Sequence, residues 1–163
     1  MQAIATILVV DDQAMVLSSL KKLLSQAPYL VLTAQSAHEA LDQLERQKVE
    51  VVISDERMPG MPGSEFLSIV RERWPETVRI ILTGYASVES AIKAINEGEI
   101  FRFLTKPCTS HELHAAVRAA LAHRTRLKPD ERNPLLDSLE KQAPGITQVR
   151  RDSDGVVIID DEA

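Results

Sequence analysis

The chain has 163 residues, of which 44% are hydrophobic and 26% charged, with a net charge of −5 and one cysteine, Cys108. This length fits one domain with a short appendage, and the acidic balance argues against general nucleic-acid binding, which usually needs a basic face. A single cysteine excludes an internal disulfide and a multi-cysteine zinc site. No apolar run is long enough to span a bilayer and no signal-peptide pattern begins the chain, so we expect a soluble, cytoplasmic protein without a membrane partner.

Short apolar runs recur along the chain with near-regular spacing. Each is apolar at successive positions, as in Ile7–Val10. Such runs are typical of strands that are buried on both faces, as in a parallel sheet. The predicted strands are Thr6–Val10, Leu30–Thr33, Val51–Ile53, Val78–Leu82 and Phe101–Leu104.

The segments between these runs have helical periodicity. Val16, Leu17, Leu20, Leu23 and Leu24 share one helical face, and we expect Pro28 to end that helix. Capping-box patterns open two further helices. These capping boxes are Ser36–Glu39 and Thr109–Glu112. Two more helices are predicted over Ser64–Arg73 and Ser87–Glu97. The alternation predicts an α/β fold, (βα)5, with a doubly wound five-stranded parallel sheet and helices on both faces.

The alternating pattern ends near Thr125. We therefore predict one domain over residues 1–125 and an acidic, mostly irregular tail over residues 126–163 without a recognisable output domain. Three prolines interrupt any long helix in the tail. Asn133–Gln142 is compatible with a short helix and Val156–Ile159 with a short strand.

Polar side chains follow four of the five predicted strands. Asp11 and Asp12 follow the first, Asp55 the third, Thr83 the fourth and Lys106 the fifth. The carboxyl ends of parallel strands lie along one edge, where doubly wound proteins bind their ligands. The second strand contributes no charge, which fits the known strand order 2-1-3-4-5, because strand 2 then lies at the margin of the sheet.

These residue types together favour phosphoryl transfer to a carboxylate. Three converging carboxylates should raise the pKa of at least one of them unless a cation intervenes. Mg²⁺ is the natural cation, since it binds one or two carboxylates together with a phosphoryl oxygen. Lys106 supplies a mobile positive charge and Thr83 a hydroxyl donor, so the set describes a carboxylate nucleophile placed for in-line transfer.

At these segments the sequence resembles the response-regulator receiver domains of two-component signalling. The resemblance covers residues 4–122 and depends on four segments that occur in the expected order. They are Ile7–Asp12, Asp55–Gly60, Thr83–Gly84 and Phe103–Pro107.

The resemblance implies that Asp55 accepts a phosphoryl group from a partner sensor histidine kinase or phosphotransfer protein. Mg²⁺ would be bound by Asp12, Asp55 and the backbone carbonyl of Arg57, with Asp11 acting through water. Arg57 and Tyr85 would tune the lifetime of the phosphorylated state. Such a protein is no enzyme in the usual sense, because it catalyses only its own phosphotransfer and dephosphorylation.

The resemblance also implies how the signal is passed on. Thr83 and Lys106 would bind the phosphoryl group, Phe103 would be the aromatic switch residue, and the Lys106–Pro107 peptide bond would be cis, which X-Pro bonds tolerate best. The changed face would bind a downstream protein or, on phosphorylation, a second copy of the chain. It comprises Ser87–Glu97, Arg102–Thr105 and Ser110–Ala122.

Several alternatives stand beside this interpretation. Asp11 and Asp12 could merely cap the first helix, Phe103 could be fixed core, and Cys108 is expected to be a packed residue rather than a reactive thiol. The histidines lack metal-site partners at convincing spacing, and we expect His111 and His114 to lie on solvated helix faces.

Rival functions also remain open. An FMN-binding flavodoxin shares the fold class, and an aspartyl-nucleophile phosphohydrolase shares the chemistry, although its nucleophile typically follows the first strand. The chain could also be the receiver portion of a longer transcriptional or cyclic-nucleotide regulator.

Overall fold

The computed structural model describes residues 3–84, 92, 95–96, 100–127, 150–151 and 157–158. The chain divides into two compact units, Met1–Leu127 and Lys128–Ala163. No helix in the described ranges is both long and apolar enough to cross a membrane.

The first unit is built on a five-stranded sheet whose paired strands are all parallel. The strand order is β2-β1-β3-β4-β5, which confirms the predicted order and fold class. Each strand lies within one or two residues of its prediction. The strands are β1 (Ala5–Val10), β2 (Tyr29–Ala34), β3 (Val51–Ser54), β4 (Val78–Thr83) and β5 (Arg102–Thr105).

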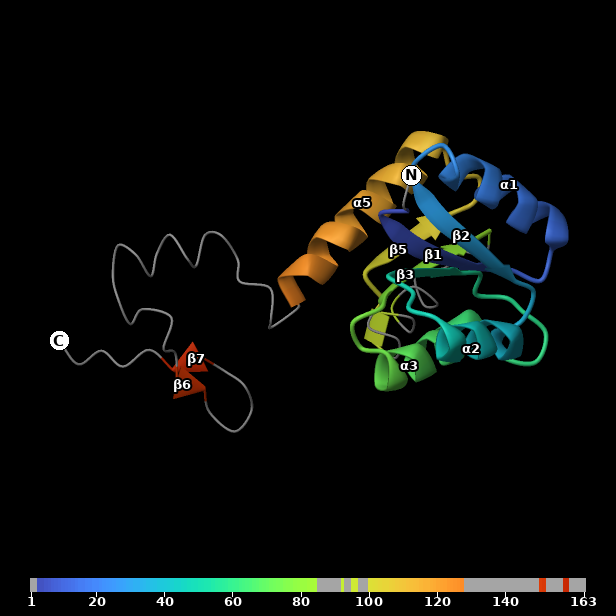
Figure 1. Ribbon diagram of the computed structural model, residues 1–163. Helices are drawn as coiled ribbons and strands as arrows, with labels where there is room; N and C mark the ends of the chain where they lie inside the picture. Colours follow the sequence, from blue (N-terminus) through green and yellow to red (C-terminus); the bar gives the residue numbers. More distant parts are fainter. Residues whose placement is uncertain are drawn as a thin grey trace. The chain divides into compact units, whose positions relative to one another are not determined.

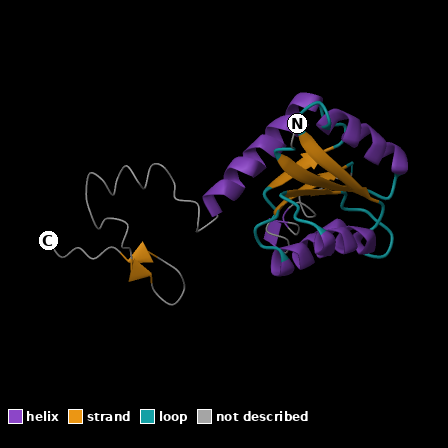
Figure 2. Ribbon diagram, viewed as in Figure 1, coloured by secondary structure: helices purple, strands orange, loops and turns teal. Residues whose placement is uncertain are grey.

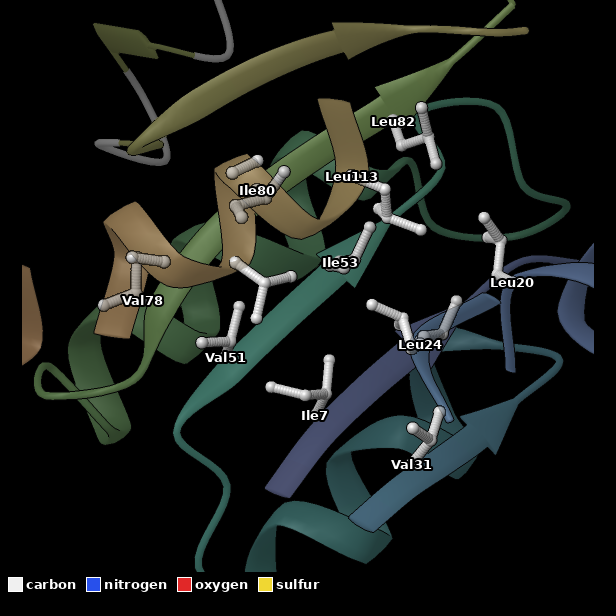
Figure 3. Packing of buried hydrophobic residues seen from close by; sticks show 14 of the residues in the cluster. Ile7, Leu20, Leu24, Val31, Val51, Ile53, Val78, Ile80, Leu82 and Leu113 are labelled. Atoms are coloured by element: carbon white, nitrogen blue, oxygen red, sulfur yellow. The ribbon is translucent and has the colours of Figure 1, made fainter. Parts of the chain in front are cut away.

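Helices cover both faces of this sheet (Figures 1 and 2). Because side chains alternate along a strand, Ile7 and Val9 of β1 join the core on one face, while Leu8 and Val10 join the core on the other. The first core is closed by α1 and α5, as Figure 3 shows for Leu24 and Leu113, and the second by α2 and α3. The helices are α1 (Ala14–Leu24), α2 (Ala37–Arg46), α3 (Gly63–Arg73) and α5 (Ser110–Leu127).

Local signals at the helix ends are partly confirmed. Both predicted N-caps form: Ser36 Oγ accepts from the backbone N–H of Glu39, and Thr109 Oγ1 from that of Glu112, each at 3.1 Å. The reciprocal bond of a capping box forms at Thr109, whose N–H donates to Glu112 Oε2, whereas the Glu39 carboxylate accepts from Gln35 instead of Ser36. The prediction that Pro28 ends the first helix is wrong. The helix ends at Leu24, and the N–H groups of Gln26 and Ala27 donate to the carbonyls three residues earlier, which forms a tight turn before Pro28.

Other predictions fall partly or wholly outside the described residues. Of the predicted helix Ser87–Glu97 only residues 92, 95 and 96 are described, and all three are helical. The predicted helix Asn133–Gln142 lies outside them entirely. In the second unit β6 (Arg150–Arg151) pairs antiparallel with β7 (Val157–Ile158). β7 lies within Val156–Ile159, the segment predicted as a short strand.

Candidate functional site

The register of the sheet brings the polar strand-end residues together. Val10 of β1 pairs with Ser54 of β3, so the next residues, Asp11 and Asp55, emerge side by side. The ladder continues one step further, because the backbone N–H of Asp55 donates to the carbonyl of Val10 at 2.9 Å. On the other side, the N–H of Lys106 donates to the carbonyl of Thr83 at 2.9 Å.

Three carboxylates converge at this edge. Ligand oxygens of Asp11, Asp12 and Asp55 all lie within 4.8 Å of one another. Asp11 and Asp55 are 2% and 9% exposed, whereas Asp12 is exposed. Buried Oδ1 of Asp55 has no hydrogen-bond partner in the described part of the chain, which is costly for a buried carboxylate. The cluster therefore has the donor chemistry of a hard-cation site, and it includes a carboxylate oxygen without a hydrogen-bond partner among the described residues.

Lys106 supplies the positive charge of the site. Its Nζ lies 2.6 Å from Oδ2 of Asp11 and 3.7 Å from Oδ2 of Asp55. The ammonium group thus offsets the repulsion between two nearly buried carboxylates. Its shorter contact is therefore with Asp11 and its longer one with Asp55.

The helix-capping alternative does not account for Asp11. The N-cap residue of α1 is Gln13, and Asp11 Oδ1 accepts from the Gln13 backbone N–H at 2.9 Å. This turn bond uses one oxygen only, and the other oxygen contacts Lys106. The turn bond and the contact with Lys106 together hold the Asp11 carboxylate in the cluster.

The remaining predicted site residues occupy different environments. Thr83 is fully buried at the end of β4, and Phe103 of β5 is half-buried against the second core, opposite Ile81. Arg57 is exposed, and the Lys106–Pro107 peptide bond is cis. Tyr85 lies outside the described residues.

Sequence reasoning missed the residues that hold the Asp55 backbone. Ser54 Oγ donates to the carbonyl oxygen of Asp55 at 2.9 Å. A Cβ on Gly63 would lie 2.1 Å from that same oxygen, so only glycine allows the start of α3 to approach so closely. The signal in the sequence was a glycine directly before the predicted helix Ser64–Arg73.

Cys108 and His114 have structural contacts. Burial, with help from nearby Glu112, raises the pKa of the Cys108 thiol to about 11, as expected for a packed residue rather than a reactive thiol. His114 Nε2 lies 2.8 Å from the carbonyl oxygen of Leu23 and its ring stacks on Tyr29. The solvated-face prediction thus fits exposed His111 and is wrong for His114, because α5 packs against α1 there.

The comparisons with known proteins identify the family. Residues 7–118 match the family described as "Response regulator receiver domain". The chain therefore belongs to the receiver domains of two-component response regulators, which are generally non-enzymatic phosphoacceptors.

Curated relatives are transcriptional regulators that are much longer than this chain. It is similar to the hydrogenase transcriptional regulatory protein HoxA of Cupriavidus necator, with 45% identity over 117 residues, which are 72% of this chain and 24% of that protein. The transcriptional regulatory protein GlrR of Escherichia coli K12 is 36% identical over 151 residues, covering 88% of this chain and 34% of that protein. The chain thus spans about a quarter to a third of the length of these relatives.

Solved receiver domains have the same fold. One is the signal receiver domain of an HD domain-containing protein from Pseudomonas fluorescens Pf-5, with 42% identity and a TM-score of 0.72 over 75% of this chain and 90% of that one. Another is the beryllofluoride-activated NtrC4 receiver domain dimer, with 32% identity and a TM-score of 0.69 over 73% of this chain and 98% of that one.

Proposed function

We propose that the first unit is a phosphorylation switch in which Asp55 accepts a phosphoryl group from a partner histidine kinase or phosphotransfer protein. The observation that carries this proposal is the nearly buried Asp55 carboxylate beside two aspartates and Lys106; one oxygen of Asp55 has no hydrogen-bond partner in the described part of the chain. In this proposal the chain is a cytoplasmic signalling protein. The only reactions that it catalyses are the transfer of a phosphoryl group to Asp55 and the loss of that group.

The acidic cluster fits Mg²⁺. Its oxygens lie within 4.8 Å of one another and include the buried Oδ1 of Asp55, which has no other partner among the described residues. Asp12 and Asp55, with the backbone carbonyl of Arg57, would hold the ion, and Asp11 would act through water. Bound there, the ion would neutralise charge on the phosphoryl oxygens.

The positions of the side chains support an in-line transfer to Asp55. An Asp55 carboxylate oxygen attacks phosphorus in line, an acyl phosphate bond forms, and the phosphorus–nitrogen bond of the donor phosphohistidine breaks, with its electron pair going to the imidazole. Lys106 turns from Asp11 toward a phosphoryl oxygen, and the Thr83 hydroxyl donates to another. Charge neutralisation and positioning are the protein's main contributions.

The test is phosphorylation by a small donor. Incubated with acetyl phosphate and Mg²⁺, the protein should gain one phosphoryl group by intact mass, and Asp55→Asn should gain none. The matched control is Asp42→Asn, which replaces an exposed aspartate of α2. This variant should gain one phosphoryl group, as the wild type does. Undiminished labelling of Asp55→Asn would refute the assignment, as would labelling that persists without divalent ions.

The output is proposed to leave through the face of residues 87–97, β5 and α5. Thr83, drawn toward the phosphoryl group, would vacate space beside Gly84 that the Phe103 ring fills by turning inward. The half-buried position of Phe103 supports a ring that has room to move. Amide shifts on adding beryllofluoride should extend across α5 in the wild type and shrink to the Asp55 loops in Phe103→Ala. Equal shifts in both proteins would remove the aromatic switch.

The lifetime of the phosphorylated state is proposed to depend on Arg57 and Tyr85. Each lies two residues beyond a site residue, where a side chain can flank the line of water attack. Exposure of Arg57 is compatible with this role. The double alanine variant should change the dephosphorylation rate, and an unchanged rate would assign gating to other residues.

A second candidate is that this receiver is part of a longer transcriptional regulator. The lengths of the HoxA and GlrR relatives favour it, and any nucleic-acid contact would then belong to the rest of that protein. The dimeric NtrC4 relative further supports dimerisation on phosphorylation. Light scattering with and without beryllofluoride tests the dimer, and the mass of the protein isolated from its own cells tests the longer chain.

A further inference from the structure

The residue after Asp55 makes an unusual connection to α3. The backbone carbonyl of Glu56 accepts from the N–H of Gly63 at 2.9 Å, which closes the intervening loop. The Glu56 side chain follows the same path: Oε2 accepts from the backbone N–H of Ser64 at 2.9 Å, and Oε1 from Ser64 Oγ at 2.8 Å. Both carboxylate oxygens are therefore engaged by one residue of the helix.

This connection serves the N-terminus of α3. The N-cap residue is Pro62, whose side chain has no acceptor, so the N–H groups of the first turn need a partner from elsewhere. Glu56 supplies a charged acceptor from eight residues upstream, where the helix dipole favours a negative charge. Ser64 is only 4% exposed, so the pair is shielded from solvent on one side.

The same contacts bear on the metal site. The loop that they close begins at Asp55 and contains Arg57, whose backbone carbonyl is the expected third protein ligand. The carbonyl of Asp55 is held by Ser54 Oγ on one side and by the close approach of Gly63 on the other. A shift in the Glu56–Ser64 contact would therefore move two expected ligands at once.

We propose that Glu56 and Ser64 form a positioning clamp that holds the Asp55–Gly63 loop in the geometry that binds Mg²⁺. The clamp also keeps both Glu56 oxygens on α3, where they cannot join the acidic cluster. This inference rests on the proposed function, because it assumes that the cluster is a Mg²⁺ site. Glu56 and Ser64 act through the loop and touch neither ion nor phosphoryl group.

The experiment is a Mg²⁺ titration of the full chain, followed by the amide shifts of Asp12 and Asp55. Glu56→Ala should weaken Mg²⁺ binding about tenfold, as is common when a residue that orients metal ligands is removed. Ser64→Ala, which keeps its backbone donor, should weaken it less. The double variant should match Glu56→Ala, because both residues act as one unit.

The matched control is Glu65→Ala, which removes an exposed acid from the same first turn of α3. Mg²⁺ affinity should be unchanged in this variant. An equal loss in Glu65→Ala and Glu56→Ala would overturn the clamp by assigning the effect to charge, and so would independent, additive losses at Glu56 and Ser64. If Glu56→Ala fails to fold, Glu56→Gln replaces it, because glutamine keeps one acceptor oxygen and should show a smaller loss in the same direction.

Acetyl phosphate labelling separates the clamp from the proposed function. Glu56→Ala should need about tenfold more Mg²⁺ for half-maximal labelling, with a rate at saturating Mg²⁺ within about twofold of wild type. A lower rate at saturation with unchanged Mg²⁺ dependence would overturn the clamp. A wild type that is never labelled would refute the phosphorylation switch, while the Mg²⁺ titration would still judge the clamp.

Discussion

Gly63→Ala tests whether the close approach of α3 to the Asp55 backbone constrains the site. The added Cβ would lie 2.1 Å from the carbonyl oxygen of Asp55, and all three nearest atoms belong to backbone that cannot rotate away. The distance between this Cβ and the Asp55 carbonyl oxygen must increase from 2.1 Å to at least 3.0 Å. The loop or the start of α3 must therefore move by 0.9 Å or more. A shift of this size is comparable to displacements that lower catalytic rates about a hundredfold.

The energetic cost can be worked from the same contact. Overpacking costs about 1–3 kcal/mol, and the preference of alanine over glycine in a helix returns at most about 1 kcal/mol. The net loss is then about 0–2 kcal/mol and should lower the melting temperature by up to roughly 5 °C. Circular dichroism measures the melting, and acetyl phosphate labelling the site.

Gly84→Ala is the matched control for stability. A Cβ there meets nothing within 4 Å in the part of the chain that the structure describes. Its melting temperature should equal or slightly exceed that of wild type, because alanine restricts the unfolded chain. If Gly63→Ala melted with the control and were labelled at the wild-type rate, the close approach would not constrain the site.

Three further predictions follow from other contacts. Lys106→Met should cost about 1–3 kcal/mol in urea unfolding at pH 7, because Asp11 is 2% exposed and loses its cation; unchanged stability would contradict that pairing. Burial and Glu112 raise the pKa of Cys108 to about 11, so its side chain should stay a protonated thiol at pH 8. Its reaction with a disulfide reagent should be roughly tenfold or more slower than that of free cysteine and should become faster as the pH approaches 11. A fast reaction at pH 8 would contradict the burial. Truncation after Leu127 should preserve folding and labelling, and loss of either would show that the second unit is integral to the first.

The sequence determined the sheet and the chemistry of its edge. Continuous apolar runs such as Ile7–Val10 predict buried parallel strands, and side-chain alternation then divides each run between two cores. The N-caps at Ser36 and Thr109 form because the N–H groups that they bind lie three residues ahead, within one helical turn. Asp11 and Asp55 meet because both follow parallel strands, whose carboxyl ends share one edge.

Contacts between distant segments were decided only by the tertiary structure. Lys106 pairs primarily with Asp11, 95 residues away, because strand register and side-chain reach set that distance. The Glu56–Ser64 contact and the close approach of Gly63 depend on where α3 docks, and the packing of α5 on α1 partly buries His114. Local patterns fix which residues face the core or the sheet edge, since periodicity is a property of neighbouring positions. The distances between those residues depend on how separate elements pack, and no local pattern contains that information.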